Sequence, residues 1–345
     1  MSATRIERDC LGEMEIPEEH YYGIQTHRMV KVSGTAHLPV IFYPGMHRAL
    51  AQIKKACARA NAEIGAITPE IGKAIAQAAD EVYAGKFDDQ FPLDMWQGGG
   101  YTCVNMNVNE VIGNRANEIL TGHKGQDTVH PNTHVNKAQS TNDTIPSATH
   151  LAIAPELDKI IAGVEALQHS FEKKAVEFKD DVKVGRTCWQ DALPLTLGQE
   201  FEGFATLMKR LAAKLKAARP GCFEIVMGGS AIGTGLGADP GYMDALYKYL
   251  SEQYGETVKP AESLFDGFQN PDFCVTISGL VKEVATSVSK ISKDLRLMSS
   301  GPRAGWMEIN LPALSPGSSI MPGKINPTVP EMVIQIAHQV VGNDV

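Results

Sequence analysis

Two long stretches of this chain repeat their apolar residues at alternating spacings of three and four positions. The first stretch carries Phe201, Phe204, Met208, Leu211 and Leu215. The second carries Val281, Val284, Val288, Ile291, Leu295 and Met298. An average spacing of 3.5 residues is typical of helices that pack nearly parallel to one another in bundles. The chain is therefore predicted to be mainly α-helical, with both stretches in a long-helix bundle of a kind that often completes itself by oligomerising.

The rest of the chain divides into a mixed part and a helical part. Four further stretches have helical character: 46–65, 69–84, 157–178 and 329–341. Pro155 is expected to kink the third of these helices or to delay its start. We expect an N-terminal domain over 1–139, mixed but mostly helical, and a central helical bundle domain over 140–345.

Composition excludes several classes of protein. With 43% hydrophobic and 21% charged residues, the 345-residue chain resembles soluble globular proteins. A net charge of −8 argues against nucleic-acid binding, because no basic stripe is available for phosphates. No apolar run reaches the roughly 18 residues that a membrane span needs. The N-terminus has no apolar signal core, and the six cysteines have no zinc-like spacing, so we expect a cytoplasmic protein with reduced thiols.

The segment 316–327 is the most unusual in the chain. It reads Pro-Gly-Ser-Ser-Ile-Met-Pro-Gly-Lys-Ile-Asn-Pro. Three prolines and two glycines rule out an ordinary helix or strand. The segment is either a surface turn or a shaped loop that presents hydroxyls and one lysine to an anionic ligand. It is not a nucleotide loop, because its spacing differs from the P-loop pattern; the glycine-rich run 228–237 likewise lacks the context of a dinucleotide site.

Three other polar clusters lie at expected helix ends. Ser140-Thr141-Asn142-Asp143 is either a helix N-cap or an anion site. Gly185 to Asp191 forms a second cluster, and Thr102, Asn105 and Asn107 form a third. We interpret His130 and His134 as structural, and the sequence contains neither a metal-ligand set nor a Ser-His-Asp arrangement. Pockets rich in hydroxyls and amides suit the recognition of carboxylates on which charge develops.

These motifs resemble those of one family, the aspartase/fumarase superfamily. Residues 317–327 closely resemble its signature loop, and the resemblance extends over essentially the whole chain. The supporting segments are Asn105 to Val111, Ser140 to Asp143, Gly185 to Thr187, Gln190 to Ala192 and Gly198 to Phe201. Further segments are more similar to the aspartate ammonia-lyase branch than to fumarases: Asp89 to Pro92, Gln97 to Gly99, Asp294 to Leu297 and Ile309 to Pro312.

The resemblance implies an all-α homotetramer around a twenty-helix core, with each active site formed by three subunits. It also implies a cofactor-free and metal-free anti-elimination that releases ammonia from L-aspartate to give fumarate through an enediolate. Ser318 would be the general base, which needs nearby donors and a cation because a free hydroxyl is a poor base. The resemblance further implies binding roles: Thr102, Ser140, Thr141 and Ser319 on the enediolate; Thr187, Lys324 and Asn326 on the α-carboxylate; Asn142 on the amino group.

The chain departs from the family pattern near the expected substrate pocket. Tyr101-Thr102-Cys103 replaces the usual Gly-Thr-Ser. Cys188 occupies a substrate-binding position at which the family commonly has histidine or glutamine. Trp189 replaces a leucine. Tyr101, Cys103 and Trp189 are therefore candidate specificity residues, with neutral repacking as the alternative. An ergothionase-like betaine lyase is one alternative function, because a trimethylammonium group over Tyr101 or Trp189 gains cation–π attraction. Fumarate hydratase is another. Cys188 as a nucleophile has no identified activating base.

Members of this family continue well beyond the position of Val345. The resemblance therefore implies that the last part of the bundle and a small C-terminal domain are absent from this chain. Missing core helices would leave apolar seams exposed. An inactive or structural family member is accordingly the non-enzyme alternative.

Overall fold

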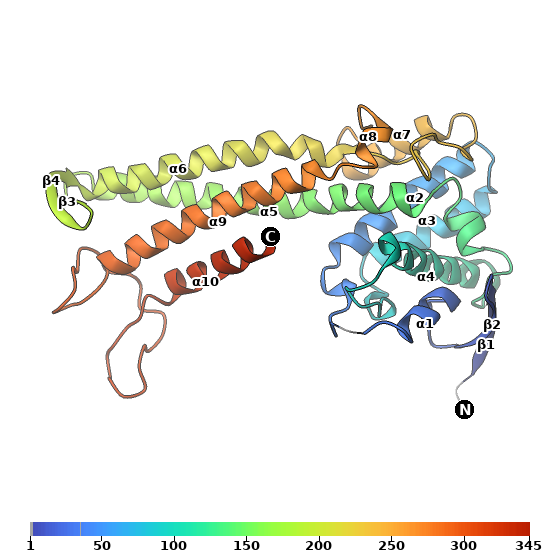
Figure 1. Ribbon diagram of the computed structural model, residues 1–345, viewed down its shortest axis with the longest axis horizontal. Coiled ribbons are helices and arrows are strands. Elements are labelled where there is room, and N and C mark those ends of the chain that lie inside the picture. The colour runs from blue at the N-terminus through green and yellow to red at the C-terminus, as the bar shows by residue number, and fades with distance from the viewer. Residues whose placement is uncertain (1–2, 35) are drawn as a thin grey trace. The chain divides into compact units, whose positions relative to one another are not determined.

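Figure 1 shows the protein as a computed structural model, which describes residues 3–34 and 36–345. Helices dominate, so the prediction of a mainly α fold is confirmed. The longest helices are α5 (Thr141–Glu177), α9 (Asp272–Met298), α6 (Leu197–Ala218), α4 (Thr102–Thr121) and α2 (Gly45–Glu63). Shorter helices are α3 (Pro69–Tyr83), α10 (Thr328–Asn343), α7 (Tyr242–Tyr254), α1 (Ile24–Val30) and α8 (Leu264–Gly267). Among the described residues, no helix is both long and apolar enough to cross a membrane.

Within the residues that the structure describes, the strands form three separate pairs. In the first, β1 (Thr4–Asp9) and β2 (Gly12–Pro17) run antiparallel with Arg5 opposite Ile16. In the second, β3 (Val182–Thr187) and β4 (Gln190–Thr196) run antiparallel with Thr187 opposite Gln190. The third joins the two-residue strands β5 (Glu224–Ile225) and β6 (Lys259–Pro260) in parallel.

The contacts group the chain into two compact units. Unit 1 comprises 1–156 and 220–270, and unit 2 comprises 157–219 and 271–345. The chain passes from one to the other inside α5, between Glu156 and Leu157. The expected domain boundary between 139 and 140 stays a prediction, because these units are groups of contacts rather than independently folding domains.

Unit 1 is built on close packing of small residues. Helices α2 and α3 pack against each other, and a Cβ added to Gly72 would lie 2.7 Å from the Cβ of Ala62. The turn between them uses Gly65 at φ 77°, a conformation that glycine adopts without strain. Thr68 then caps α3 by accepting a hydrogen bond from the Ile71 N–H. The α2–α3 pair matches the helices predicted over 46–65 and 69–84.

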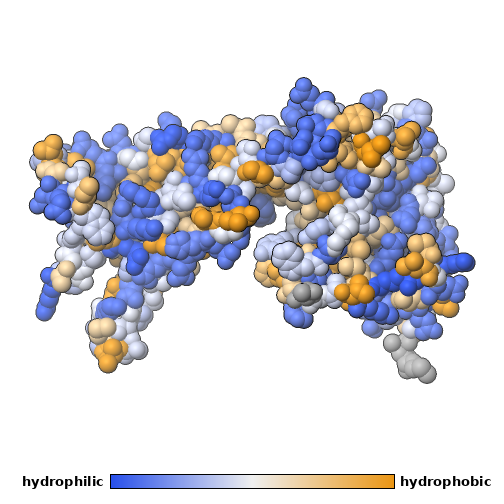
Figure 2. Space-filling view, in the orientation of Figure 1, coloured by the Kyte–Doolittle hydropathy of each residue, from blue (hydrophilic) through white to orange (hydrophobic). Residues whose placement is uncertain are grey.

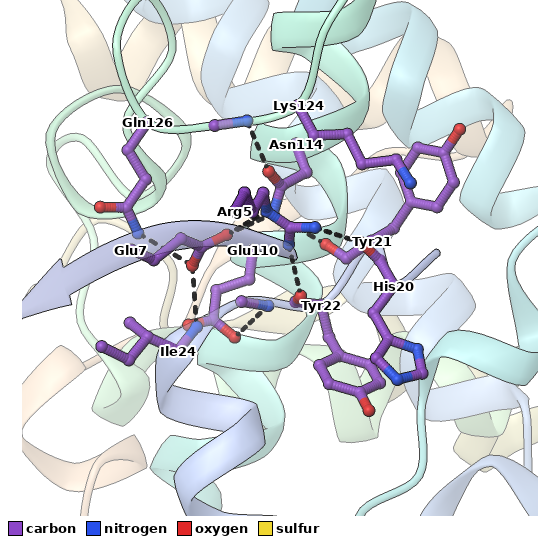
Figure 3. Close-up of polar contacts among 12 residues, drawn as sticks. Arg5, Glu7, His20, Tyr21, Tyr22, Ile24, Glu110, Asn114, Lys124 and Gln126 are labelled. Carbon is purple, nitrogen blue, oxygen red and sulfur yellow. Dashed lines mark hydrogen bonds and ion pairs between the residues drawn. The ribbon is translucent and has the colours of Figure 1, made fainter. Parts of the chain in front are cut away.

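The β1–β2 hairpin of unit 1 is held by two buried carboxylates (Figure 3). Glu7 on β1 accepts a hydrogen bond from the Ile24 N–H at 2.8 Å, at the start of α1. Glu110 on α4 accepts from the Gly23 N–H at 3.0 Å and from the Thr26 hydroxyl at 2.6 Å. Both carboxylates therefore satisfy the free N–H groups at one helix start, which joins three elements that are distant in sequence.

Unit 2 contains both predicted apolar stripes. All five stripe residues of α6 are buried, as expected for a bundle seam. In α9, only Ile291 and Met298 of the six are buried, and the other four are half-buried. Helix α9 packs against α6 and α10, and the segment 299–327 connects α9 to α10 without any helix or strand (Figure 1). Connections of this length without a helix or strand are uncommon, and they usually either have a function or act as linkers.

One helix differs from its prediction. Helix α5 begins at Thr141 and contains both Pro146 and Pro155, so Pro155 neither starts nor ends it. The Ser140–Asp143 segment is consequently the start of a 37-residue helix. A proline inside a helix loses one backbone hydrogen bond, and packing of the buried residues Leu151, Ala154 and Leu157 on either side of Pro155 offsets that loss.

Candidate active site

The start of α5 is a tightly bonded turn in unit 1. The buried Asp143 carboxylate accepts hydrogen bonds from the Ser140 N–H at 2.9 Å and from the Ser230 and Gly228 N–H groups at 3.0 and 3.2 Å. Burial raises the pKa of Asp143 to about 6, although these N–H groups oppose the rise. The Ser140 hydroxyl accepts from the Asn142 N–H at 3.2 Å. The turn is thus a helix cap, and its hydroxyl protons remain available as donors.

The glycine-rich run 228–237 supports this turn. Gly228, Gly233, Gly235 and Gly237 all have positive φ, and Ser230 has φ 59°. The run presents its backbone N–H groups to Asp143 and its Ala231 carbonyl to the Asn142 side-chain amide at 2.9 Å. The run therefore has a structural role in supporting the start of α5.

A buried polar network lies behind the turn. The fully buried Lys54 of α2 donates to Asn136 Oδ1 at 2.9 Å and to Gln139 Oε1 at 2.8 Å. Asn105 of α4 donates to the same Asn136 Oδ1 at 3.3 Å and to Thr141 Oγ1 at 3.4 Å. Lys54 was not predicted as a site residue from the sequence. The sequence feature that could have indicated its burial is helical spacing: Lys54 lies on the same face of α2 as Leu50, Ala58 and Asn61, which are all buried.

The Tyr101–Cys103 segment lies at the start of α4. Tyr101 adopts φ 62° and donates its hydroxyl to the Met95 carbonyl at 3.0 Å. Thr102 is exposed and donates its hydroxyl to the Gly99 carbonyl at 2.7 Å. Cys103 is half-buried, and burial raises the pKa of its thiol, so the thiolate is disfavoured.

An open cavity of about 640 Å³ lies at the start of α5 in unit 1, and Tyr101, Thr102 and Cys103 are not among its lining residues. Thr141 and Asn142 line it together with Gly100, the neighbour of Tyr101. Its apolar lining comes from Ile145, Pro146, Ala231, Ile232, Phe265 and Phe268. The cavity is large enough for a small amino acid, and it offers a hydroxyl and an amide beside apolar walls.

The hairpin of unit 2 carries Thr187, Cys188 and Trp189. All three are exposed, and Cys188 and Trp189 form a two-residue turn with φ values of 51° and 65°. Two left-handed residues are what a tight hairpin turn of this type requires, but asparagine and glycine are the usual choices. Cys188 and Trp189 are therefore held in a strained backbone conformation.

Trp306 is a second tryptophan beside this hairpin. Its ring lies edge-to-face with that of Trp189 at a centroid distance of 6.3 Å. The Arg186 guanidinium stacks over Trp306 at 4.0 Å and also donates to Glu308 at 2.7 Å. Trp306 was not among the predicted site residues, because its contact with the hairpin is made across a long stretch of chain.

The predicted signature loop of unit 2 is held in shape by hydrogen bonds between its own residues. The Gly317 N–H donates to the Lys324 carbonyl at 2.8 Å, and the Asn326 amide donates to the Gly317 carbonyl at 3.0 Å. A Cβ at Gly317 would lie only 2.7 Å from Asn326, so this position requires glycine. The Ser318 hydroxyl oxygen accepts from the Met321 and Ile320 N–H groups at 3.0 and 3.3 Å. Ser319 and the Lys324 side chain are exposed.

The candidate residues thus fall into two groups. Thr102, Ser140, Thr141 and Asn142 lie in unit 1, and Thr187, Cys188, Ser318, Ser319, Lys324 and Asn326 lie in unit 2. His130 Nδ1 accepts hydrogen bonds from the Asn132 and Thr133 N–H groups, and His134 Nδ1 accepts from the His130 N–H, as expected for structural histidines. No cluster of metal-ligating side chains occurs within residues 3–34 and 36–345.

Comparison with known proteins supports the resemblance. A lyase family model matches residues 12–342. An aspartate ammonia-lyase of a Bacillus species is 47% identical over 99% of this chain and 73% of that protein. The mitochondrial fumarate hydratase of Danio rerio is 46% identical over 99% of this chain and 68% of that protein.

Solved structures of lyases from this family have the same fold as this chain. The crystal structure of a fumarate lyase:delta crystallin from Brucella melitensis bound to cobalt has a TM-score of 0.95 at 44% identity, covering 99% of this chain and 75% of that one. A class II fumarase from Schistosoma mansoni has a TM-score of 0.94 at 36% identity, covering 99% and 75%. The chain belongs to the aspartase/fumarase lyase family.

Proposed function

We propose that the protein is a carbon–nitrogen lyase that converts L-aspartate to fumarate and ammonia. A base removes a proton from Cβ, the electron pair is held as an enediolate on the adjacent carboxylate, and the Cα–N bond then breaks. Aspartate ammonia-lyases 45–48% identical to the chain over nearly its whole length support this choice among the reactions of the family. The elimination needs no cofactor, since the enediolate charge can be held by hydrogen-bond donors.

The environment of Ser318 is the observation that carries the proposal. Its hydroxyl oxygen accepts two backbone hydrogen bonds, from Ile320 and Met321. Two N–H donors stabilise negative charge on this oxygen after its proton is lost. We therefore assign Ser318 as the general base. The loop that holds it is shaped by Gly317 and Asn326, which accounts for those residue types in this segment.

The remaining side chains supply donors and one acceptor. Thr102, Ser140, Thr141 and Ser319 are proposed to stabilise the enediolate. Thr187, Lys324 and Asn326 are proposed to bind the α-carboxylate, with Cys188 beside them. Asn142 uses its amide N–H on Ala231, so its Oδ1 can accept a hydrogen bond from the substrate ammonium.

We further propose that the chain acts as a homotetramer with active sites shared between subunits. Four of the six stripe residues of α9 are only half-buried, and α10 exposes Val329, Met332 and Ile336. Apolar patches are visible on the surface in Figure 2. Such surfaces favour burial against further copies of the chain. All six cysteines are free thiols, which fits a cytoplasmic location.

A second candidate is a related lyase that releases trimethylamine from a betaine. Trp189 is 73% exposed and lies against Trp306, so the hairpin offers aromatic surface suited to a quaternary ammonium group. Fumarate hydratase is a third candidate, because one such enzyme is nearly as similar to the chain. The non-enzyme alternative is an inactive or structural member of the family.

One experiment separates these candidates. The purified protein is incubated in turn with L-aspartate, ergothioneine and L-malate, and the ultraviolet absorbance of the conjugated product is followed. We expect product from L-aspartate with release of ammonia. Turnover of ergothioneine alone would replace the aspartate assignment, and turnover of L-malate alone would indicate a hydratase. An assembled oligomer that is inactive on all three substrates would support the structural alternative.

A further inference from the structure

Lys54 is a buried charge that the proposed chemistry does not use. The side chain lies on the buried face of α2 with 0% of its surface exposed. Lysine is rarely buried completely, because an ammonium group loses its hydration there. Its two acceptors, Asn136 Oδ1 and Gln139 Oε1, are neutral amide oxygens. A leucine or methionine would fill the same volume at a lower desolvation cost, so packing alone does not account for the charge.

The ammonium group determines how the Asn136 amide is turned. An ammonium only donates hydrogen bonds, so Asn136 must direct its oxygen, and not its NH₂, toward Lys54. The same oxygen accepts from the side-chain amides of Asn109 at 3.1 Å and Asn105 at 3.3 Å. The Asn136 NH₂ donates in the opposite direction, to the Gln139 carbonyl at 3.1 Å. The buried side chains Lys54, Asn105 and Asn109 thus agree with the Gln139 carbonyl on one orientation of the half-buried Asn136. The Asn105 and Asn109 amides could turn over, whereas the Lys54 ammonium, as a pure donor, and the Gln139 carbonyl, as a pure acceptor, cannot reverse their roles.

The orientation continues to Thr141. Because Asn136 offers an acceptor, Asn105 must turn its NH₂ toward it, and the second N–H of that group reaches Thr141 Oγ1 at 3.4 Å. The Asn105 oxygen accepts from the Thr144 hydroxyl at 3.3 Å. Thr141 Oγ1 is therefore an acceptor on its inner side. Its hydroxyl proton is left to point outward, and Thr141 lines the 640 Å³ cavity.

We propose that Lys54 is a positioning residue that sets the donor direction of the Thr141 hydroxyl through Asn136 and Asn105. It does not touch the ligand. The hydroxyl presented in this way is a donor to a carboxylate in the cavity of unit 1. This role rests on the proposed function, since it takes the carboxylate to be that of L-aspartate or of the enediolate derived from it.

The presence of Asp143 favours an orienting role for Lys54 over a direct electrostatic attraction between Lys54 and an anionic ligand. It is a second buried ionisable group near Lys54, and its negative charge favours the protonated form of that lysine. The opposite charge of Asp143 offsets part of the attraction that Lys54 exerts on an anion. The amide orientation, in contrast, is passed on through successive hydrogen bonds and is not offset.

The first test uses Lys54→Met, which keeps the length of the side chain and removes its charge. We expect the KM for L-aspartate to rise about tenfold, since a hydrogen bond to a charged group contributes about 1.5–3 kcal/mol. Lys55→Met is the matched control, because Lys55 is the next residue of α2 and pairs with Asp80 near the surface. Its KM should stay within about twofold of wild type.

A second variant covers the case in which Lys54→Met does not fold. Asn105→Asp keeps the shape of the side chain but turns the group facing Thr141 Oγ1 into an acceptor. The Thr141 hydroxyl would then donate inward, so the same rise in KM is expected while Lys54 stays in place. Wild-type KM values for Asn105→Asp, or for a folded Lys54→Met, would overturn the proposal.

A double-mutant cycle separates positioning from general structural support. If Lys54 acts through Thr141, Lys54→Met should add less than about twofold to the KM of Thr141→Ala, because coupled residues are not additive. Full additivity of the two changes would contradict the proposal.

Succinate binding by calorimetry makes the test independent of turnover. If the wild type binds succinate but does not convert L-aspartate, the proposed reaction fails and Lys54 is judged from the succinate dissociation constants of the same variants. If the wild type binds neither compound, both the reaction and the positioning role are wrong.

Discussion

Trp189 and Trp306 meet edge-to-face with their ring centroids 6.3 Å apart, and this contact joins the β3–β4 hairpin to the segment that follows α9. Arg186 reinforces the contact by stacking on Trp306 and pairing with Glu308. Thr187, a proposed ligand of the substrate carboxylate, belongs to the same hairpin. The aromatic contact therefore holds a proposed binding residue in place.

We predict that Trp306→Leu weakens substrate binding more than it slows turnover. An aromatic pair contributes about 0.5–1.5 kcal/mol beyond its burial, so KM should rise about two- to tenfold with kcat nearly unchanged. Steady-state kinetics measure this split, and a red shift of Trp189 fluorescence should accompany it. Trp96→Leu is the control for the loss of a tryptophan outside the hairpin contact, because Trp96 lies in unit 1 with 71% of its surface exposed. An unchanged KM in Trp306→Leu would contradict the prediction.

Cys188 allows the strain in the hairpin turn to be measured. With φ 51° it occupies a region where asparagine is tolerated better than other side chains that carry a Cβ. Cys188→Asn should raise the free energy of unfolding by up to about 1 kcal/mol, measured by denaturant titration. Cys188→Ala keeps the unfavourable backbone conformation and should show no gain. Equal stability of the two variants would mean that the turn carries no strain at this position.

Ser318→Ala tests the assignment of the general base. Loss of a general base typically costs about 10²–10⁴ in rate, so turnover of L-aspartate should become undetectable or nearly so. Size-exclusion chromatography should show an unchanged oligomer, because the loop lies outside the helices of unit 2. Ser315→Ala, an exposed serine just before the signature loop, is the control and should keep wild-type activity. Substantial activity in Ser318→Ala would remove this residue from the base role.

The periodic helices were the most predictable part of the fold. The stripe from Phe201 to Leu215 is buried as expected, because apolar residues repeated every 3.5 positions form one continuous face only on a helix. The N-cap interpretation of Ser140–Asp143 indicated a helix start there, but a single helix from Thr141 to Glu177 was not predicted, since Pro146 and Pro155 are local helix breakers that tertiary packing overrides. The stripe on α9 was predicted correctly as a helical pattern, but most of its residues are only half-buried. An apolar pattern identifies the face of a helix that packs, and it does not identify the neighbour that covers this face.

Site candidates could be named from the sequence where polar residues are concentrated in a short, unusual segment. The loop of Ser318, Lys324 and Asn326 stands out because neither a helix nor a strand accommodates its prolines and glycines, and the family resemblance supplied the proposed roles of these residues. Lys54 could not, because a single lysine in a helix usually extends its ammonium to water and only the folded arrangement shows it enclosed. Trp306 was missed for a related reason, since its partner Trp189 is remote in sequence.

Lys54 should make dicarboxylate binding dependent on pH. Burial lowers the pKa of Lys54 to about 8. The other titratable groups near it change charge elsewhere: Asp143 has a pKa of about 6, the Cys57 thiol a pKa of about 12, and burial raises the pKa of Tyr242 well above its usual value. As pH rises through about 8, Lys54 loses its proton and no longer fixes the Asn136 amide. The succinate dissociation constant should therefore increase between pH 7 and 9.

The free energy of unfolding should rise with pH, although succinate binding weakens. Because the folded-state pKa of Lys54 lies below its unfolded value, the unfolded chain binds more protons between pH 8 and about 10.5, and the contribution of Lys54 to stability rises with pH there. Calorimetric titrations with succinate, which stays fully ionised over pH 7–9, and denaturant titrations measure the two trends. Lys54→Met should flatten both. A wild-type dissociation constant that is constant from pH 7 to 9 would contradict the prediction.

Substitution of Glu110 tests how much the buried acid pair Glu7 and Glu110 at the start of α1 contributes to stability (Figure 3). Its carboxylate accepts hydrogen bonds from the N–H groups of Gly23, Gln25 and Thr26 and from the Thr26 hydroxyl. Glu110→Gln would turn an NH₂ group toward some of these donors. We expect the free energy of unfolding at pH 7 to fall by about 1–3 kcal/mol, because buried donors lose their acceptor. Glu118→Gln, two turns along α4 and partly exposed, should cost less than about 1 kcal/mol.

The pH dependence of the Glu110 effect follows from its raised pKa. Burial, together with the nearby Glu7 charge, raises the pKa of Glu110 to about 7, above the value of about 4.5 in the unfolded chain. The folded state therefore binds more protons than the unfolded state between these values, and this contribution to stability is lost as pH rises through 7. The stability difference between wild type and Glu110→Gln should accordingly be larger at pH 5 than at pH 8. A difference that grows with pH would show that the hydrogen bonds to the ionised carboxylate outweigh the cost of burying its charge.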